Sequence, residues 1–271
     1  MQARPAFSGE FRQNFEMTVA VEVGPKHGLK VASTPVASMP YAFSDNGAAA
    51  GELVFVGYGV RSKEHDYDDY AGIDVTGKIA VALDGEPGDD DPRSPFNGTR
   101  RTRHAQASFK ATVAREAGAK ALIVVKPKMV APRTAEAPAG IMIVAASDGT
   151  ALGINVEEEA KAIAKGYRPR SRALGTQASL QVELVRRRRS VPNVGALIGP
   201  ADGTEMVVLG AHYDHLGLGA EGSLESKPAG LIHNGADDNA SGVAALLAVA
   251  KTLSKNQDLK RQVLLLFFAG E

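Results

Sequence analysis

The sequence contains no cysteine among its 271 residues. This absence excludes disulfide bonds and thiolate metal sites, so any metal ion has to be bound by His, Asp or Glu. An excess of one charge is also missing, because 31 acidic side chains balance 31 basic ones. No global field therefore favours nucleic acid or an anionic membrane, and we expect neither as a partner.

Long apolar runs are absent as well. The longest, Val263 to Ala269, is far shorter than the roughly 20 residues that a membrane-spanning helix needs. The first thirty residues show no apolar signal core behind a basic start. We therefore expect no membrane span, and either a cytosolic protein or one whose targeting segment lies outside this sequence.

The first two thirds of the chain predict a β-rich α/β unit. Residues 9–24 alternate in places between apolar and polar, which predicts a half-exposed strand. The small residues Ser44 to Gly51 predict a linker. Beyond them the pattern predicts strands at 53–58, 78–83, 121–125, 140–145 and 178–185, and helices at 107–117 and 156–165. The basic run Arg186 to Arg189 is interpreted as a solvated junction rather than a nucleic-acid patch.

From Ser190 onward the pattern changes to strand, helix, strand. The segments Met206–Ala211 and Val263–Ala269 are continuous apolar runs, typical of parallel strands that are buried on both faces. Between them, Val243 to Leu253 carries an apolar stripe at helical spacing. The sequence therefore predicts an open α/β sheet, in which ligands bind outside the carboxyl ends of the strands.

Polar residues gather at those strand ends. His212 and Asp214 follow the first strand, Glu271 follows the second, and Asp237 opens the intervening helix. His212, Asp237 and Glu271 each have an ordinary explanation when taken alone: a hydrogen-bonded histidine, a helix cap and a solvated terminal residue. Their convergence favours a metal hydrolase, because an oxygen and nitrogen ligand set suits Zn²⁺ or another divalent ion. A carboxylate that bridges two such ions gives a two-metal hydrolytic site.

Two other polar clusters have simpler interpretations. The run Asp89 to Asp91 lacks the alternating ligands of a calcium loop and is expected to be an exposed acidic turn. His215 and His233 flank the candidate site, where either could contact substrate, but surface positions are favoured for both.

Three motifs, in order and at suitable spacing, resemble the two-zinc aminopeptidases of the aminopeptidase Y and glutamate carboxypeptidase type. They are Leu209–Gly217 (LGAHYDHLG), Asn234–Gly242 (NGADDNASG) and Phe268–Glu271 (FAGE). The middle of the chain is similar to the protease-associated domain often inserted into this family, most clearly at Tyr67–Ala80 and Glu116–Ala121.

The resemblance implies an α/β fold with three parts. Residues 1–45 would start a catalytic domain with a phosphorylase/hydrolase-like open mixed sheet. Residues 46–188 would form the inserted β-rich protease-associated domain, and residues 189–271 would form the first half of the zinc peptidase domain. The likeness also implies a secreted or periplasmic protein.

The resemblance further implies a role for each site residue. His212 would bind one zinc ion and Asp237 would bridge two. Asp214 would orient the His212 ring through its second nitrogen. Glu271 would act as general base toward the water that attacks a peptide substrate. The family's remaining ligands would follow Glu271 and its leading helices would precede residue 1. The chain is therefore expected to be cut at both ends and to be a poor enzyme alone.

The motifs leave the substrate open. A carboxypeptidase or a relative of glutaminyl cyclase would carry the same metal-side residues as an aminopeptidase. A non-catalytic binding or receptor homologue would share the fold and the inserted domain, but it would have no need of His212, Asp237 and Glu271. The oligomeric state is not encoded in these patterns.

Overall fold

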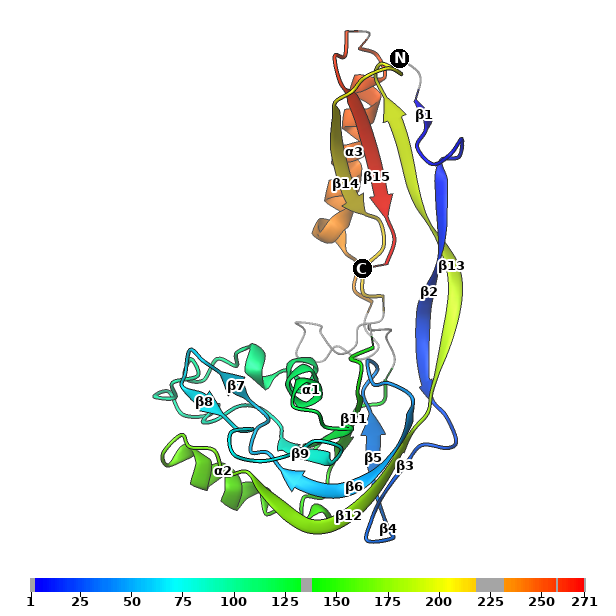
Figure 1. Ribbon diagram of the computed structural model, residues 1–271. Coiled ribbons are helices and arrows are strands. Elements are labelled where there is room, and N and C mark those ends of the chain that lie inside the picture. The colour runs from blue at the N-terminus through cyan, green and yellow to red at the C-terminus, as the bar shows by residue number, and fades with distance from the viewer. Residues whose placement is uncertain (1–2, 133–137, 218–231, 257, 271) are drawn as a thin grey trace. The chain divides into compact units, whose positions relative to one another are not determined.

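The computed structural model describes residues 3–132, 138–217, 232–256 and 258–270 (Figure 1). The chain forms two compact units. Residues Met1–Val19 and Arg187–Glu271 make up the first, which we call the site unit, and Ala20–Arg186 make up the second, the middle unit. Strands β2 (Arg12–Val23) and β13 (Leu184–Ile198) pair with each other and contain the two crossings between the units.

The middle unit is built on an eight-stranded mixed sheet with the order β4-β3-β12-β6-β9-β10-β11-β5. The four strands β6, β9, β10 and β11 run parallel to one another. Its strands are β3 (Gly28–Val31), β4 (Thr34–Val36), β5 (Ser38–Pro40), β6 (Gly47–Phe55), β9 (Ile79–Leu83), β10 (Ala121–Val125), β11 (Met142–Ala146) and β12 (Arg172–Val182). A short hairpin, β7 (Arg61–Ser62) with β8 (Tyr67–Asp68), lies outside this sheet.

Each face of this sheet carries its own core and one helix. Successive residues of the central strands alternate between the two cores, as Leu53 and Val54 do, because side chains of a strand point to opposite faces. Helix α1 (Ala107–Glu116) packs into one core through Ala111 and Ala114. Helix α2 (Val156–Ala164) packs into the other through Ile163. The mixed α/β class expected from the sequence is therefore confirmed.

The predicted linker from Ser44 to Gly51 is wrong. Ser44 is fully buried, and its hydroxyl accepts a hydrogen bond of 2.8 Å from the backbone N–H of Ile143. Strand β6 begins at Gly47 and pairs with β12. The segment is held in the sheet by pairing with β12 and β9, which composition alone does not reveal. The unit also begins near residue 20 rather than 46, because β3, β4 and β5 pair into its sheet.

The site unit has a smaller mixed sheet with the order β1-β13-β15-β14, in which β1 spans Arg4–Pro5. Strand β14 (Met206–His212) runs parallel to β15 (Gln262–Phe268), and β15 runs antiparallel to β13. An irregular turn, Ala236–Ala240, leads into helix α3 (Ser241–Leu253). The predicted strand, helix and strand are therefore present within two residues of their expected bounds.

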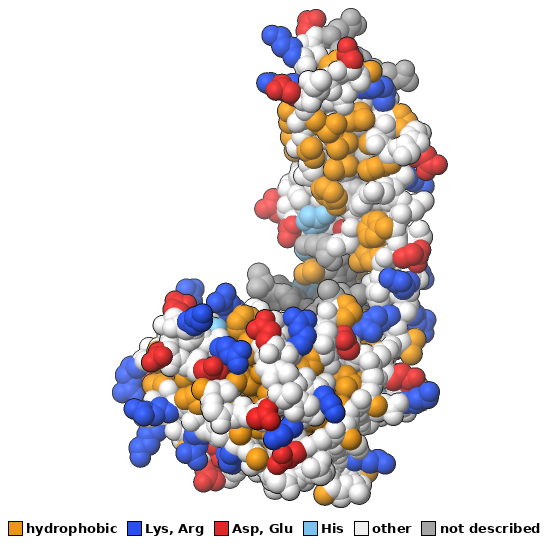
Figure 2. Space-filling view, in the orientation of Figure 1, with side chains coloured by type: hydrophobic (Ala, Val, Ile, Leu, Met, Phe, Trp, Pro, Cys, Tyr) orange, Lys and Arg blue, Asp and Glu red, His pale blue; other side chains and the backbone are white. Residues whose placement is uncertain are grey.

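Helix α3 packs on this sheet through Leu246, supported by Val243, Ala250 and Leu253. The predicted stripe is thus largely confirmed, but Leu247 is 57% exposed and points away from this core. The expected burial of β14 on both faces is also wrong within the described residues, because Val207 and Val208 are exposed. Its only strand neighbour in the described sheet is β15, and apolar side chains gather on the face of the site unit that carries these strands (Figure 2).

Among the helices of the described residues, none combines the length and the apolar character that crossing a membrane requires.

Candidate metal centre

Two neighbouring parallel strands bring the site residues to one edge of the site unit's sheet. His212 is the last residue of β14 and lies opposite Phe268, the last residue of β15. The turn before α3 reaches the same edge, because Asp238 contacts His212. The carboxyl ends of parallel strands are the usual position of ligand sites in open α/β sheets.

The ring of His212 is held from both sides. Its Nδ1 lies 2.9 Å from the backbone carbonyl oxygen of Asp214, and its Nε2 lies 2.9 Å from Oδ1 of Asp238. A carbonyl oxygen can only accept a hydrogen bond, so Nδ1 carries the hydrogen. The hydrogen bond through Nδ1 therefore fixes both the tautomer and the orientation of the ring.

With the hydrogen on Nδ1, the Nε2 atom of a neutral His212 ring has a lone pair and no hydrogen. A neutral His212 would direct a lone pair from Nε2 at the carboxylate of Asp238, and two acceptors at 2.9 Å repel each other. The contact is favourable only if a positive charge lies between the two atoms, either as a second proton on the ring or as a metal cation. An imidazole nitrogen and a carboxylate oxygen are ligands that Zn²⁺ accepts, so the residues fit the ion.

The structure brings Asp238 to His212, whereas Asp237 is engaged elsewhere. Oδ1 of Asp237 accepts a hydrogen bond of 3.1 Å from the hydroxyl of Ser241 in the first turn of α3. Asp238 leaves the helical conformation, with φ −119° and ψ 86°, and its side chain turns back toward β14. The bridging role expected for Asp237 remains a prediction. Asp238 is the residue that the sequence interpretation missed; the Asp-Asp pair was its only signal.

Two glycines make this turn possible. Gly235 has a φ of +58°, and a Cβ atom there would lie 2.7 Å from the His215 ring. A Cβ on Gly242 would lie 2.1 Å from Oδ1 of Asn239. Real Cβ atoms are not found at such distances, so the close approach of the turn to its neighbours requires glycine at both positions.

Asp214 connects the two strand ends. Its carbonyl oxygen holds the His212 ring, and its carboxylate Oδ2 accepts a hydrogen bond of 2.6 Å from the backbone N–H of Gly270. Its Oδ1 is buried and has no hydrogen-bond partner within the described residues. The orienting contact to His212 thus comes from the main chain of Asp214, and the side chain serves the segment after β15. Glu271, the predicted base, lies outside the described residues.

The flanking histidines lie near this edge. The ring centroids of His215 and His233 are 6.4 Å apart, and His233 pairs with Gly217 through a backbone hydrogen bond of 2.7 Å. Both rings are partly exposed. No group of three or more His, Asp or Glu side chains that could hold a metal ion occurs in the part of the chain that the structure describes.

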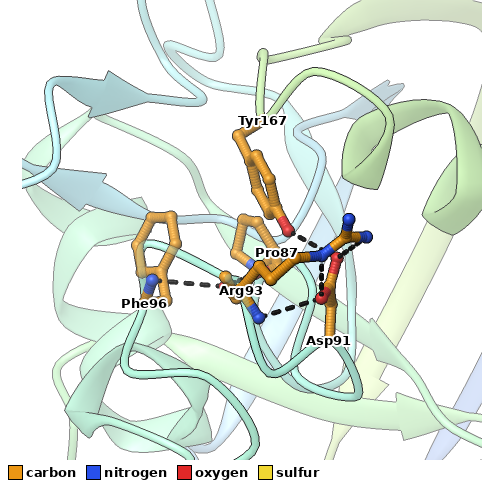
Figure 3. A network of polar contacts seen from close by, with 6 residues as sticks. Pro87, Asp91, Arg93, Phe96 and Tyr167 are labelled. Atoms are coloured by element: carbon orange, nitrogen blue, oxygen red, sulfur yellow. Dashed lines mark hydrogen bonds and ion pairs between the residues drawn. The ribbon is translucent and has the colours of Figure 1, made fainter.

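The acidic turn of the middle unit forms its own polar network (Figure 3). Asp91 accepts hydrogen bonds from the backbone and side chain of Arg93 and from the hydroxyl of Tyr167. The hydrogen bonds from Arg93 lower the pKa of Asp91 to about 2. Asp89 forms an ion pair of 2.7 Å with Arg101. These carboxylates are engaged by cationic side chains, as is typical of a structural turn rather than a metal loop.

Residues 193–271 match peptidase family M28. Over 79 residues the chain is 43% identical to the uncharacterized protein YfbL of Escherichia coli K12. The aligned residues make up 29% of this chain and 22% of that protein. Similar solved structures include an aminopeptidase from Aneurinibacillus sp. strain AM-1 (TM-score 0.46, 22% identity) and the zinc aminopeptidase BSAP from Bacillus subtilis (TM-score 0.44, 20% identity). The matches cover 96% of this chain but only 52% and 50% of those two chains, so the chain spans about half their length.

Proposed function

We propose, from the family M28 sequence of residues 193–271, that the full-length protein is a zinc-dependent exopeptidase that removes amino-terminal residues from peptides. The observation that supports this most directly is the contact between His212 Nε2 and Asp238 Oδ1, which requires a positive charge between its atoms. In this proposal His212 and Asp238 hold a zinc ion. Asp238, in place of Asp237, would also be the carboxylate shared with a second ion.

Asp214 orients His212 for zinc binding in this proposal. The carbonyl oxygen of Asp214 keeps the Nδ1 hydrogen of His212 in place, so Nε2 offers its lone pair to the ion without a tautomer change. A zinc ion bound there would polarise the attacking water and the scissile carbonyl group. Two ligands are fewer than the four that a zinc ion usually takes. The proposal therefore needs further ligands besides His212 and Asp238.

Glu271 is proposed as the general base. A carboxylate can accept the proton of the attacking water and later pass it to the departing amine. This role needs the carboxylate to be near the attacking water rather than bound to the ion. Its support is the position of Glu271 in sequence, directly after the segment that Asp214 binds.

A substrate panel with the full-length protein tests the proposal. L-leucine p-nitroanilide should be hydrolysed, N-acetyl-leucine p-nitroanilide should not, and chelation should abolish turnover until zinc is restored. The Glu271→Gln variant should lose about 100-fold or more in kcat, a typical effect of losing a general base. Hydrolysis only of substrates with a free carboxyl terminus would favour a carboxypeptidase. Cyclisation of amino-terminal glutamine would favour a glutaminyl cyclase. No turnover despite bound zinc would favour a binding protein.

A further inference from the structure

The segment that follows β15 is fixed by three hydrogen bonds. The carbonyl oxygen of Phe268 accepts one of 2.9 Å from the backbone N–H of Tyr213. The N–H of Ala269 donates one of 3.1 Å to Oδ1 of Asn193, and the N–H of Gly270 donates one of 2.6 Å to Oδ2 of Asp214. Two consecutive peptide N–H groups are thus bound by side chains from two other strands or strand ends.

Asn193 binds the N–H of Ala269 at the point where regular strand pairing stops. The ladder between β13 and β15 ends at the pair Val194 and Phe267. One residue further along, the side-chain oxygen of Asn193 accepts the N–H of Ala269. The amide nitrogen of Asn193 donates a hydrogen bond of 3.2 Å to Oε1 of Gln13 on β2, which holds the amide plane in one orientation.

The backbone at Gly270 is unfavourable for any residue with a side chain. Gly270 has a φ of +100°, and a Cβ atom there would lie 3.3 Å from the sulfur of Met17. A planar peptide group whose N–H is bound cannot rotate independently. Anchoring the N–H groups of residues 269 and 270 therefore fixes the two peptide planes that lead to the Cα atom of Gly270, directly before residue 271.

We propose that Asn193 is a positioning residue for Glu271, an inference that rests on the proposed function. Asn193 contacts neither substrate nor metal in this proposal. It fixes the main chain that directly precedes Glu271, and this would restrict where the base can lie relative to the attacking water. Catalysis is sensitive to such placement, because an error of about 1 Å can cost about 100-fold in rate. Asp214 contributes the second anchor but also holds the His212 ring, so Asn193 is the cleaner position to test.

The test compares three substitutions in the full-length, zinc-loaded protein. Asn193→Leu removes the acceptor for the Ala269 N–H and should lower kcat by about tenfold to 100-fold, with KM and zinc content unchanged. Asn193→Asp keeps an acceptor oxygen and should retain kcat within about threefold of the parent protein. Gln13→Ala removes only the partner of the amide nitrogen and should have an effect no larger than that of Asn193→Asp. If Asn193→Leu fails to fold, Asn193→Ala replaces it with the same expectation.

A double variant separates this inference from the proposed function. In a Glu271→Gln background, Asn193→Leu should cause no further loss of the residual kcat, because residues that act as a unit are not additive. Equal losses in both backgrounds, or an unchanged kcat in Asn193→Leu while Glu271→Gln is impaired, would overturn the inference alone. Full activity of Glu271→Gln would overturn the proposed function, and the inference with it.

Discussion

At the scale of single residues, Gly270 is a constrained position near the candidate site. Its φ of +100° is unfavourable for any residue with a Cβ atom. We predict that Gly270→Ala in the full-length protein lowers kcat about tenfold or more, because the strain shifts the entry into residue 271. Gly153→Ala is a matched control, since Gly153 also has a positive φ of +81° but lies in the middle unit. Equal kcat values for the two variants would contradict the prediction.

His104 gives the middle unit a defined response to acid. It is 2% exposed, its Nδ1 has no hydrogen-bond partner within the described residues, and burial lowers its pKa below the ordinary value of 6.5. Below about pH 6.5 the unfolded chain therefore binds a proton that the folded chain does not, so stability falls as the pH falls.

The corresponding measurement is denaturant unfolding of the chain between pH 7.5 and pH 5. We expect the free energy of unfolding of the middle unit to decrease on acidification, and to decrease less steeply in His104→Phe, which keeps the aromatic contacts with Phe96 and Phe109. An identical pH slope in both proteins would show that His104 is not the titrating group.

The contact between His212 and Asp238 shows where prediction from sequence stops at this scale. The pattern placed the acidic segment before α3 at the edge where β14 ends, which agrees with the contact of Asp238, but it named Asp237. It could not indicate which carboxylate faces His212, because that depends on the non-helical backbone at Asp238 and Asn239. Propensity and periodicity describe regular structure, and this turn is irregular. The sequence did not indicate Asn193 for a similar reason, because its side-chain hydrogen bond to Ala269 lies just beyond the end of the strand ladder.

At the scale of elements, helix α3 offers a direct comparison of two adjacent leucines. Leu246 is 8% exposed and belongs to the core of the site unit, whereas Leu247 is 57% exposed. We predict that Leu246→Ala lowers the free energy of unfolding of the 271-residue chain by about 2–5 kcal/mol. Leu247→Ala should change it by about 0.5 kcal/mol or less. Denaturant unfolding followed by circular dichroism measures both, and equal losses would contradict the packing described for α3.

Elements with strong periodicity were predicted well, and those defined by tertiary pairing were not. Apolar patterns in the sequence were sufficient to predict β9, β10, β15 and α3. The small residues of β6 suggested a linker because they lack β-branched side chains, yet β6 pairs with both β12 and β9. Its strand conformation depends on those neighbours, which no local pattern contains.

At the scale of the whole molecule, the two units have separate cores. The two clusters of the middle unit draw on residues from Val21 to Leu184, and the cluster of the site unit draws on Ala3 and on residues from Ile198 to Phe267. A unit with its own core can fold independently. We predict that residues 20–186 alone unfold cooperatively, with a midpoint close to that of one transition of the 271-residue chain. Calorimetry of both proteins tests this, and a non-cooperative melt of the isolated segment would contradict it.

Zinc titration of two full-length variants by calorimetry distinguishes Asp238 from Asp237 as the carboxylate that joins His212 in the proposed zinc site. Asp238→Asn should weaken zinc binding by about 100-fold or more, because changing even a residue that only supports a ligand typically costs 10–100-fold. Asp237→Asn should bind zinc within about threefold of the parent protein, because its carboxylate is hydrogen-bonded to Ser241 in the described structure. The reverse pattern, with zinc lost in Asp237→Asn and retained in Asp238→Asn, would exclude Asp238 as the zinc ligand and assign that role to Asp237.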